Sequence, residues 1–345
     1  MRPADVLARA LGHLDAFQGP PAAAWPCPDR GDYKEWQHFS VHGHGVDALI
    51  NYNVASGGRG AREGHVTALV REGAWDGDVD AYAGEAVVLR RDRLDASFGR
   101  SALALRDGEY HLSVALADRP ISLSLALRPE TAPLLRYHVP FGPGASAHWL
   151  IIPRLRARGT IAIDGREHRL EGAPAYHDHN WGRFAWGGDF AWEWGYGLPA
   201  CAANPWSVVF TRLGDRARTA VSMQALLLWK GGRQHRSLSG RDVEVIEEGR
   251  LRPRRIVKVP RVMALLAPEA ATDVPRRLEV RAAAGSDHLR LRFEAEDLVQ
   301  ILVPNDRELG VTVLNEVKSS IRLDGVVGGE RVEMEGHGMF EIVSA

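Results

Sequence analysis

Strict alternation of apolar and polar side chains constrains the fold of this chain more than any other feature. The runs ISLSLALRP (121–129), HLRLRFEAE (288–296) and RVEMEGHGMFEIV (331–343) each place apolar residues on one face and polar residues on the other. A period of two is typical of half-buried antiparallel strands. Asp-Gly and Gly-Gly pairs separate such runs and predict tight turns at 107–108, 164–165, 231–232 and 324–325. The pattern predicts an all-β protein built from barrels or sandwiches.

The N-terminal twenty residues follow a different pattern. Apolar residues recur there at helical spacing, which predicts a short amphipathic helix over residues 1–20 that ends at Gly19-Pro20. At 345 residues the chain exceeds what a single core usually supports. We expect an N-terminal domain over residues 21–187 and a C-terminal domain over residues 188–345, because FAWEWGYG begins a new strand there. The Pro- and Gly-rich residues 142–144 are an alternative boundary.

Composition excludes several classes of function. A net charge of −1 lacks the basic excess that nucleic-acid binding needs. Cys27 and Cys201 form neither a CxxC pair nor a disulfide framework, and no apolar run is long enough to insert stably in a membrane. The chain has no Walker loop, no strand-GxGxxG-helix unit and no GxSxG elbow. We therefore expect a cytoplasmic protein that uses no nucleotide cofactor.

The stretch YHDHNWGRFAWGGDFAWEW, residues 176–194, gathers acid/base groups and tryptophans. Apolar surroundings disfavour a charged carboxylate, so an Asp178 enclosed by indole rings would stay protonated and act as a proton donor. The rings in question belong to Trp181, Trp186, Trp192 and Trp194. Alternatively, Asp178 and Asn180 cap a tight turn and the tryptophans are ordinary core residues.

Two His-x-His pairs, His42/His44 and His177/His179, raise the question of a metal. Residues two apart in a strand point the same way and can supply two imidazoles to one ion. Further ligands would come from Glu193, Glu35 or His38. The pair alone is a common pattern, and exposed turn histidines explain it as well, so we expect no metal.

Polar and aromatic residues also alternate in EWQH (35–38) and NYN (51–53), on two adjacent predicted strands. Alternation puts Glu35 and Gln37 on one face of the first strand and Trp36 and His38 on the other. Either face could line a pocket together with Asn53. Five of the ten tryptophans lie between Trp181 and Trp206, a density that suits a large apolar ligand or a core.

Two blocks of the sequence resemble a known family. The run from Trp149 through GTIAIDG to GAPAYHDHNWG is similar to the signature of the hydroxyneurosporene synthase (carotenoid hydratase) and AttH-like group. The matching positions are Gly159, Gly165, Gly172, Tyr176, Asp178, His179, Asn180, Trp181 and Gly182. The C-terminal run resembles the closing strands of the family through Glu316, Gly325, Gly328, Gly336, Gly338 and Glu341.

The resemblance implies two lipocalin-like antiparallel β-barrel domains packed together, an elongated apolar substrate and no cofactor. Family members hydrate isoprenoid double bonds or cyclise natural-product intermediates. We therefore predict acid-assisted hydration or cyclisation with Asp178 as proton donor, assisted by His177, His179 and Tyr176. The predicted substrate contacts are Trp181, Asn180, Trp186, Trp192, Trp194, Glu193, Trp36, Glu35 and Asn53. The alternatives are a Diels-Alder-type pericyclase that preorganises its substrate and a non-catalytic lipid-binding protein.

Overall fold

The computed structural model describes residues 11–18, 33–56, 62–90, 92–142, 144–267 and 273–344. The chain divides into two compact units, Met1–Val139 with Ala145–Phe184 (unit 1) and Pro140–Gly144 with Ala185–Ala345 (unit 2). Among the described residues, one sheet has 12 strands and the other has 10. Apart from one short parallel pair, every pairing is antiparallel, and the predicted all-β fold is confirmed. The predicted boundary between residues 187 and 188 stays a prediction.

Unit 1 contains the 12-stranded sheet, in the order β4-β3-β2-β1-β12-β11-β9-β8-β7-β6-β5, with β10 paired to β11. Its strands are β1 (Tyr33–His42), β2 (Asp47–Ser56), β3 (Arg62–Glu72), β4 (Ala74–Ala83), β5 (Val87–Leu89), β6 (Asp95–Phe98), β7 (Ser101–Arg106), β8 (Glu109–Ala115), β9 (Ile121–Pro129), β10 (Leu134–Pro140), β11 (Ser146–Ile163) and β12 (Arg166–Arg183). A single 3₁₀ turn, η4 (Gly84–Ala86), precedes β5.

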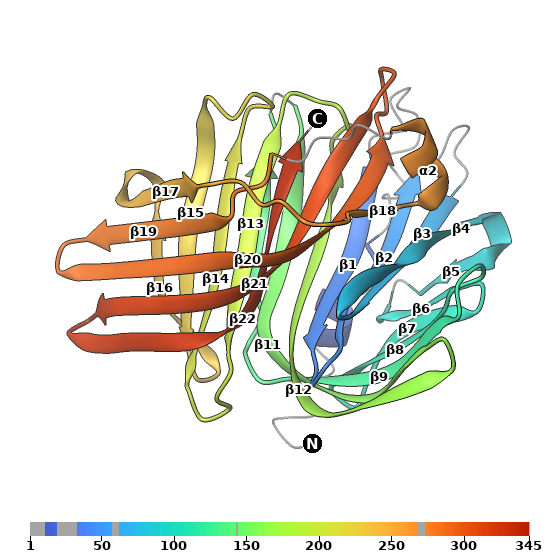
Figure 1. Ribbon diagram of the computed structural model, residues 1–345, viewed down its shortest axis with the longest axis horizontal. Helices are drawn as coiled ribbons and strands as arrows, with labels where there is room; N and C mark the ends of the chain where they lie inside the picture. Colours follow the sequence, from blue (N-terminus) through green and yellow to red (C-terminus); the bar gives the residue numbers. More distant parts are fainter. Residues whose placement is uncertain are drawn as a thin grey trace. The chain divides into compact units, whose positions relative to one another are not determined.

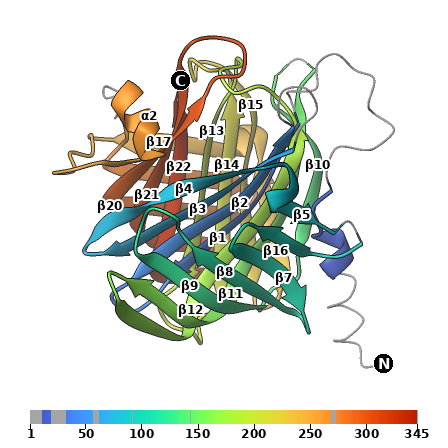
Figure 2. The same ribbon diagram turned by 90° about the vertical axis from the view of Figure 1, so that its right-hand side faces the viewer.

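The sheet of unit 1 curls back on itself, as Figure 2 shows, because β5 and β6 contact β3 near the other end of the strand order. The inward side chains form one apolar core that includes Phe39, Phe98 and Leu125. Leu11 and Phe17 belong to this core as well. Residues 11–14 are helical, in agreement with the short helix expected at the N-terminus, while residues 1–10 and 19–20 lie outside the described part. Segment 11–18 is thus built into the interior of unit 1.

Unit 2 contains the 10-stranded sheet, in the order β16-β15-β14-β13-β22-β21-β20-β19-β17, with β18 parallel to β20 (Figure 1). Its strands are β13 (Ala191–Pro199), β14 (Trp206–Gly214), β15 (Val221–Lys230), β16 (Arg233–Ser239), β17 (Val243–Glu248), β18 (Val257–Val259), β19 (Arg277–Ala284), β20 (Asp287–Pro304), β21 (Val311–Val327) and β22 (Glu330–Ser344). Its helical elements are η5 (Gly240–Asp242) and α2 (Arg261–Leu266). The strands β15 and β16 contact β17 and β19, so this sheet also curls around its core, which includes Phe210, Phe293 and Phe340.

Three of the four predicted turns connect strands directly. Asp107-Gly108, Asp164-Gly165 and Gly231-Gly232 each join two strands in a two-residue loop. Asp164 and Gly165 both have positive φ, at 51° and 77°, as the favoured hairpin turns require. The turn predicted at residues 324–325 is wrong, because both residues lie inside β21 and the hairpin turns at Gly328-Gly329. A Cβ on Gly325 would overlap the carbonyl oxygen of His288, so this glycine serves close strand packing.

The DHNWG block lies inside β12, so the tight-turn interpretation of Asp178 and Asn180 is wrong. Its glycine has a packing role, since a Cβ on Gly182 would overlap the carbonyl oxygen of Ser146 on the neighbouring β11. Among the described residues, no helix is long and apolar enough to cross a membrane. Because β12 is continuous through the block, its side chains alternate strictly between two faces.

Candidate functional site

The predicted acid/base residues lie on β12, and β1 pairs with this strand along their whole length. Residues opposite one another in the pairing share a face of the sheet. Glu35, Gln37 and Phe39 stand opposite Trp181, His179 and His177. Trp36, His38 and Ser40 stand opposite Asn180, Asp178 and Tyr176. The first set is on the same side as the apolar core of unit 1, here called the inner face, and the second set is on the outer face.

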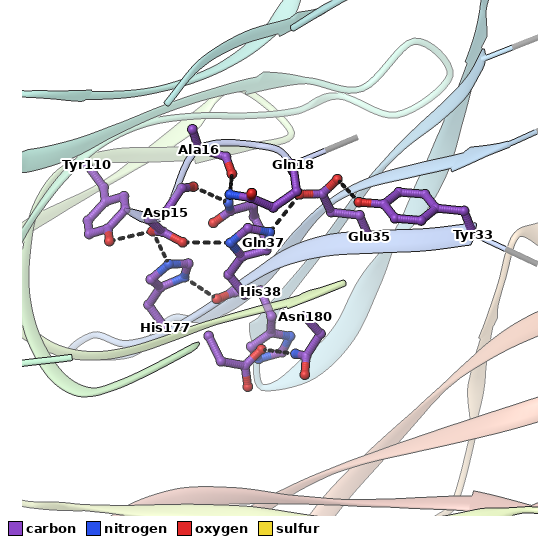
Figure 3. Close-up of polar contacts among 12 residues, drawn as sticks. Asp15, Ala16, Gln18, Tyr33, Glu35, Gln37, His38, Tyr110, His177 and Asn180 are labelled. Atoms are coloured by element: carbon purple, nitrogen blue, oxygen red, sulfur yellow. Dashed lines mark hydrogen bonds and ion pairs between the residues drawn. The ribbon is translucent and has the colours of Figure 1, made fainter. Parts of the chain in front are cut away.

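Four ionisable side chains meet on the inner face, and we call Asp15, Glu35, His177 and His179 the inner network (Figure 3). Nε2 of His177 lies 2.9 Å from Oδ2 of Asp15, and Nδ1 of His179 lies 2.8 Å from Oδ1 of the same carboxylate. Nε2 of His179 lies 2.8 Å from Oε1 of Glu35. All four side chains are buried, so the interior of unit 1 contains a cluster of ionisable groups that are hydrogen-bonded to one another.

Neutral donors complete the inner network. The Tyr110 hydroxyl donates to Asp15 Oδ2 over 2.6 Å, and the Tyr33 hydroxyl donates to Glu35 Oε2 over 2.7 Å. The backbone N–H of Gln18 donates to Glu35 Oε1 over 2.6 Å. Each carboxylate oxygen therefore accepts at least one hydrogen bond, which is the condition under which buried charges are tolerated.

The hydrogen-bond pattern fixes the charges in this network. Nδ1 of His177 faces the backbone carbonyl of His38 at 2.8 Å, and a carbonyl only accepts, so this nitrogen carries a proton. Burial raises the pKa of Asp15, but the charge of His177 and hydrogen bonds from His177 and His179 outweigh it, so the pKa lies below its ordinary value. Burial lowers the pKa of His179, but the hydrogen bonds that its ring donates to Asp15 and Glu35 outweigh this effect and raise the pKa to about 9. Asp15 and His179 therefore form an ion pair at neutral pH.

Aromatic rings enclose the two histidines of the inner network. The ring of Phe39 stacks on His177 with centroids 4.1 Å apart and an interplanar angle of 10°. Trp181 lies beside His179, with ring centroids 4.5 Å apart, and packs against the apolar core. Trp181 therefore lies on the face of β12 opposite to Asp178. The hydrogen bonds of the network connect segment 11–18 to β1 and β12, which indicates a structural role.

The outer face holds a second polar group, and we call His38, Asn51, Tyr176, Asp178 and Asn180 the outer cluster. The Tyr176 hydroxyl donates to Oδ2 of Asp178 over 2.9 Å, and Nδ2 of Asn180 donates to Oδ1 over 2.8 Å. Asp178 is only 4% exposed. Both partners come from the same strand at spacing two, so the strand itself positions the carboxyl group.

His38, which stands opposite Asp178, belongs to this cluster in the neutral form. Its Nδ1 lies 2.9 Å from Oδ1 of Asn51 and its Nε2 lies 2.8 Å from Oγ of Ser40. Burial lowers its pKa to about 3, although the hydrogen bond to Asn51 acts in the opposite direction. An amide oxygen only accepts, so Nδ1 carries the proton and Nε2 accepts from Ser40. The outer cluster therefore contains an uncharged imidazole beside its carboxyl group.

Trp36 and Asn53 stand opposite each other on β1 and β2, on the same outer face. Both are half-buried. The edge of Trp36 packs against Phe184, with ring centroids 6.0 Å apart. The structure thus brings two predicted substrate-binding residues onto the face that holds Asp178, whereas Glu35 points to the interior of unit 1.

In unit 2, Trp192 and Trp194 are buried on one face of β13. Trp186 lies beside Trp192, with ring centroids 5.6 Å apart. The Trp192 indole N–H donates to Oε1 of Glu341 on β22. Burial raises the pKa of Glu341, against hydrogen bonds from Glu316 and Trp192, and Glu316 stands opposite it on β21. This carboxyl group is a second candidate acid.

Glu193 points to the face of β13 opposite to Trp192 and Trp194, because successive side chains in a strand point to opposite faces. Arg212 Nη1 lies 3.2 Å from its Oε2, and Arg218 Nε lies 2.9 Å from its Oε1. A carboxylate held by two guanidinium groups is a structural ion pair rather than a proton donor. The structure therefore separates Glu193 from Trp192 and Trp194.

The His-x-His pairs do not converge on one point. His42 is buried with Nδ1 3.0 Å from Oδ1 of Asp47, while His44 is exposed. The expectation that both are exposed turn residues is wrong for His42, which ends β1. In the described ranges, no three His, Cys, Asp or Glu side chains are arranged to hold a metal ion. Cys201 is exposed as a free thiol, and Cys27 lies outside the described residues.

Sequence reasoning missed Asp15, Asn51 and the buried carboxyl group of Glu341. Asp15 lies 162 residues from His177 in the chain, so no local pattern connects them. The position of Asn51 beside His38 could have been predicted, because NYN and EWQH alternate in the same way on neighbouring strands. Glu341 stands in the C-terminal block that carries the family resemblance, and its place there was the available signal.

The fold is shared with several solved structures. An AttH-type protein from Nitrosomonas europaea has a TM-score of 0.65 and 14% identity, covering 95% of this chain and 96% of that chain. CghA, solved with Sch210972, has a TM-score of 0.58 and 14% identity over 91% of this chain and 89% of that chain. Kievitone hydratase from Nectria haematococca has a TM-score of 0.58 and 13% identity over 92% and 90%.

These likenesses confirm the expected resemblance to the AttH-like group and its lipocalin-type fold. They do so through structure alone: no protein-family model and no curated protein matches the sequence. At 13–14% identity, the similarity establishes the fold only, and the chemistry has to be inferred from the residues of this chain.

Proposed function

We propose that this protein is a cofactor-independent enzyme that acts on a carbon-carbon double bond of a large apolar isoprenoid, polyene or polyketide-type substrate. The proposed reaction is acid-assisted hydration or cyclisation, with Asp178 as the proton donor. The observation that carries the proposal is the setting of Asp178, which is 4% exposed and held by Tyr176 and Asn180 opposite a neutral His38. The shared fold with a protein named a hydratase supports it.

The proposed chemistry begins with the acid form of Asp178. The proton on Oδ2 passes to one alkene carbon, the π electrons form the new C–H bond, and the more substituted carbon becomes a cation. Water captures the cation and loses a proton to the carboxylate, which gives an alcohol. Capture by an internal double bond instead gives a ring, and the new cation then loses a proton to the carboxylate. Both routes regenerate the acid.

Tyr176 and Asn180 are the positioning residues in this proposal. In the acid form the Tyr176 oxygen accepts the Oδ2 proton, and after transfer the same hydroxyl donates to the carboxylate, because a phenol does both. Asn180 Nδ2 holds Oδ1 in either state. His177 and His179, expected from sequence to orient Asp178, lie in the inner network and face away from it.

Substrate contacts are assigned from the same face. We propose that Trp36 and Asn53, on the outer face of unit 1, contact the substrate, and that Trp36 stabilises the developing cation through its indole ring. The contacts expected in unit 2, Trp186, Trp192 and Trp194, stay predictions, and Glu341 beside Trp192 is an alternative acid within that unit. The cytoplasmic location expected from sequence stays a prediction.

A second candidate function is a pericyclase that works by holding one substrate conformer. It is favoured by the hydrogen bonds that both Asp178 oxygens already accept, since such a carboxyl group is also suited to fixing a polar end of a ligand. Under this function the outer cluster binds and the acid form of Asp178 is unnecessary.

The test starts from the purified protein. Native mass spectrometry with organic extraction identifies what the protein carries, and a polyene, terpenoid or polyketide-like molecule supports the proposal. That molecule, or a precursor lacking the elements of one water, is then incubated with wild type and Asp178→Asn. Loss of conversion in the variant supports acid catalysis. Retained conversion favours the pericyclase, and tight retention of an unconverted ligand by both proteins indicates a carrier.

A further inference from the structure

One segment of unit 2 is rich in basic residues. The segment GRLRPRRIVKVPR, residues 249–261, contains six basic residues and no acidic residue. It runs from the end of β17 through β18 to α2, as Figure 1 shows. Arg252, Arg254 and Arg255 are all exposed. A cluster of cations in one exposed segment produces a local positive potential even on a chain of nearly zero net charge.

Among the described residues, these three arginines differ from some nearby arginines in having no acidic partner. Arg250, at the start of the segment, lies 2.7 Å from Asp273, and on β19 Arg281 Nε lies 2.6 Å from Glu279. None of Arg252, Arg254 and Arg255 forms an ion pair with another residue that the structure describes. Their charge is therefore available to an anionic partner.

Two exposed apolar side chains follow in α2. Val262 is 65% exposed and Leu265 is 82% exposed, although most large apolar residues of the described chain are buried. They are three residues apart in a helix and so lie on the same side of it. A polar aqueous partner gains nothing from these two side chains, whereas a lipid interface buries them.

We propose that residues 252–265 form a membrane-docking surface that binds the anionic headgroups of a phospholipid bilayer through Arg252, Arg254 and Arg255 and inserts Val262 and Leu265 at the interface. Cations next to an apolar anchor are the combination that peripheral binding requires. A nucleic acid would use the arginines but not the apolar pair. The inference goes beyond the proposed reaction, because it rests on a surface that contains no residue of the outer cluster.

The experiment is co-sedimentation of the full-length protein with vesicles, without any substrate. One vesicle preparation contains equal parts of phosphatidylcholine and phosphatidylglycerol, and the other contains phosphatidylcholine alone. The protein should prefer the anionic vesicles, and added salt should weaken the binding, because screening shortens the reach of surface charges. At roughly fivefold for each arginine near an anionic surface, R252Q/R254Q/R255Q should lower the partition constant about a hundredfold.

The apolar pair and a matched control complete the design. V262S/L265S should lower the partition constant about tenfold through lost apolar burial. The variant R128Q/R233Q/R241Q removes the same charge from exposed arginines elsewhere and should bind like wild type. Equal binding to both vesicle types, or equal loss in the control, would overturn the proposal. Binding to a DNA duplex that depends on the arginines but not on Val262 and Leu265 would replace it with a nucleic-acid site. Because no turnover is measured, each outcome is independent of the proposed reaction.

Discussion

The two faces of β12 use neighbouring residues of one strand for opposite purposes. On the inner face His177 and His179 are hydrogen-bonded to Asp15 and Glu35, and these contacts raise the pKa of His179 to about 9. On the outer face Asp178 is held by neutral donors, opposite a His38 whose pKa burial lowers to about 3. In the inner network each carboxyl group is hydrogen-bonded to at least one imidazole ring. In the outer cluster the carboxyl group of Asp178 accepts hydrogen bonds from the neutral donors Tyr176 and Asn180, and we propose that it carries the reacting proton.

The contrast shows why a compact motif is a poor guide to a compact site. In HDHN the histidines and Asp178 are adjacent in sequence, yet their side chains lie on opposite faces of the sheet because side chains alternate along a strand. Buried ion pairs cost desolvation energy and persist where all partners are present, which suits a structural role. The proposed chemistry therefore uses the alternate residues Tyr176, Asp178 and Asn180.

The largest expected effect is on turnover. Asp178→Asn should lower kcat by about a hundred- to ten-thousand-fold, the usual contribution of a positioned general acid. Unfolding should change little, because an asparagine still reaches Tyr176 and Asn180. Conversion of the extracted ligand measures the first effect and chemical denaturation the second. Asp164→Asn, in the turn at the end of the same hairpin, is the control and should behave like wild type.

The next effect is on stability and concerns the inner face. Asp15→Asn leaves His177 and His179 without the carboxylate that they share, so the free energy of unfolding should fall by about 3–5 kcal/mol. Denaturant titration measures it, with Asp118→Asn at an exposed turn as the matched control. A loss below about 1 kcal/mol, as exposed pairs show, would mean that the network is not a closed set of buried charges.

The two faces should also respond to pH in opposite directions. His179 has a folded pKa of about 9, raised from 6.5, so its contribution to stability is complete below pH 6.5 and is lost as pH rises toward 9. His38 has a folded pKa of about 3, lowered from 6.5, so its contribution is complete above pH 6.5 and is lost as pH falls toward 3.

Denaturation of wild type across this range should therefore show a decline in stability at each end, of at most about 3 kcal/mol on the alkaline side from His179 and at most about 5 kcal/mol on the acid side from His38. His179→Gln should flatten the alkaline limb and His38→Asn the acid limb. If His179→Gln flattened the acid limb instead, the assignment of charged and neutral histidines to the two faces would be reversed.

The smallest expected effect concerns the hydrogen bond between Tyr176 and Asp178 in the outer cluster. Tyr176→Phe removes one hydrogen bond to Oδ2 of Asp178 and should cost about 1 kcal/mol in transition-state stabilisation, about a fivefold loss of kcat/KM. Tyr33→Phe, which removes the matching hydroxyl from Glu35 on the inner face, should leave kcat/KM unchanged and lower only stability. Equal losses of activity in both variants would contradict the division between the faces.

Local sequence pattern predicted much of this fold. The runs at 121–129, 288–296 and 331–343 all lie in strands, and three of the four turn pairs join strands, because period-two patterning and positive-φ glycine are local properties. Asp324-Gly325 failed because a glycine needed for strand contact looks the same in sequence as a turn glycine.

The site was only partly predictable. Alternation placed Glu35 and Trp36 on opposite faces correctly, and the same rule applied to 177–179 would have separated the histidines from Asp178. Which face is interior depends on pairing between β1 and β12, and the partnership of Asp15 with His177 spans 162 residues. Such long-range contacts follow from the folded chain rather than from a local pattern.

The most direct test of the central claim compares metabolites in the native host. Strains carrying wild type, a deletion, Asp178→Asn or Asp164→Asn at the chromosomal locus are extracted and profiled by mass spectrometry, with protein levels checked by immunoblot. We predict that the Asp178→Asn strain accumulates the same apolar compound as the deletion, lighter than the missing product by one water for hydration or equal in mass for cyclisation. An Asp178→Asn strain that matches wild type, at normal protein level, would contradict the assignment of Asp178 as the acid.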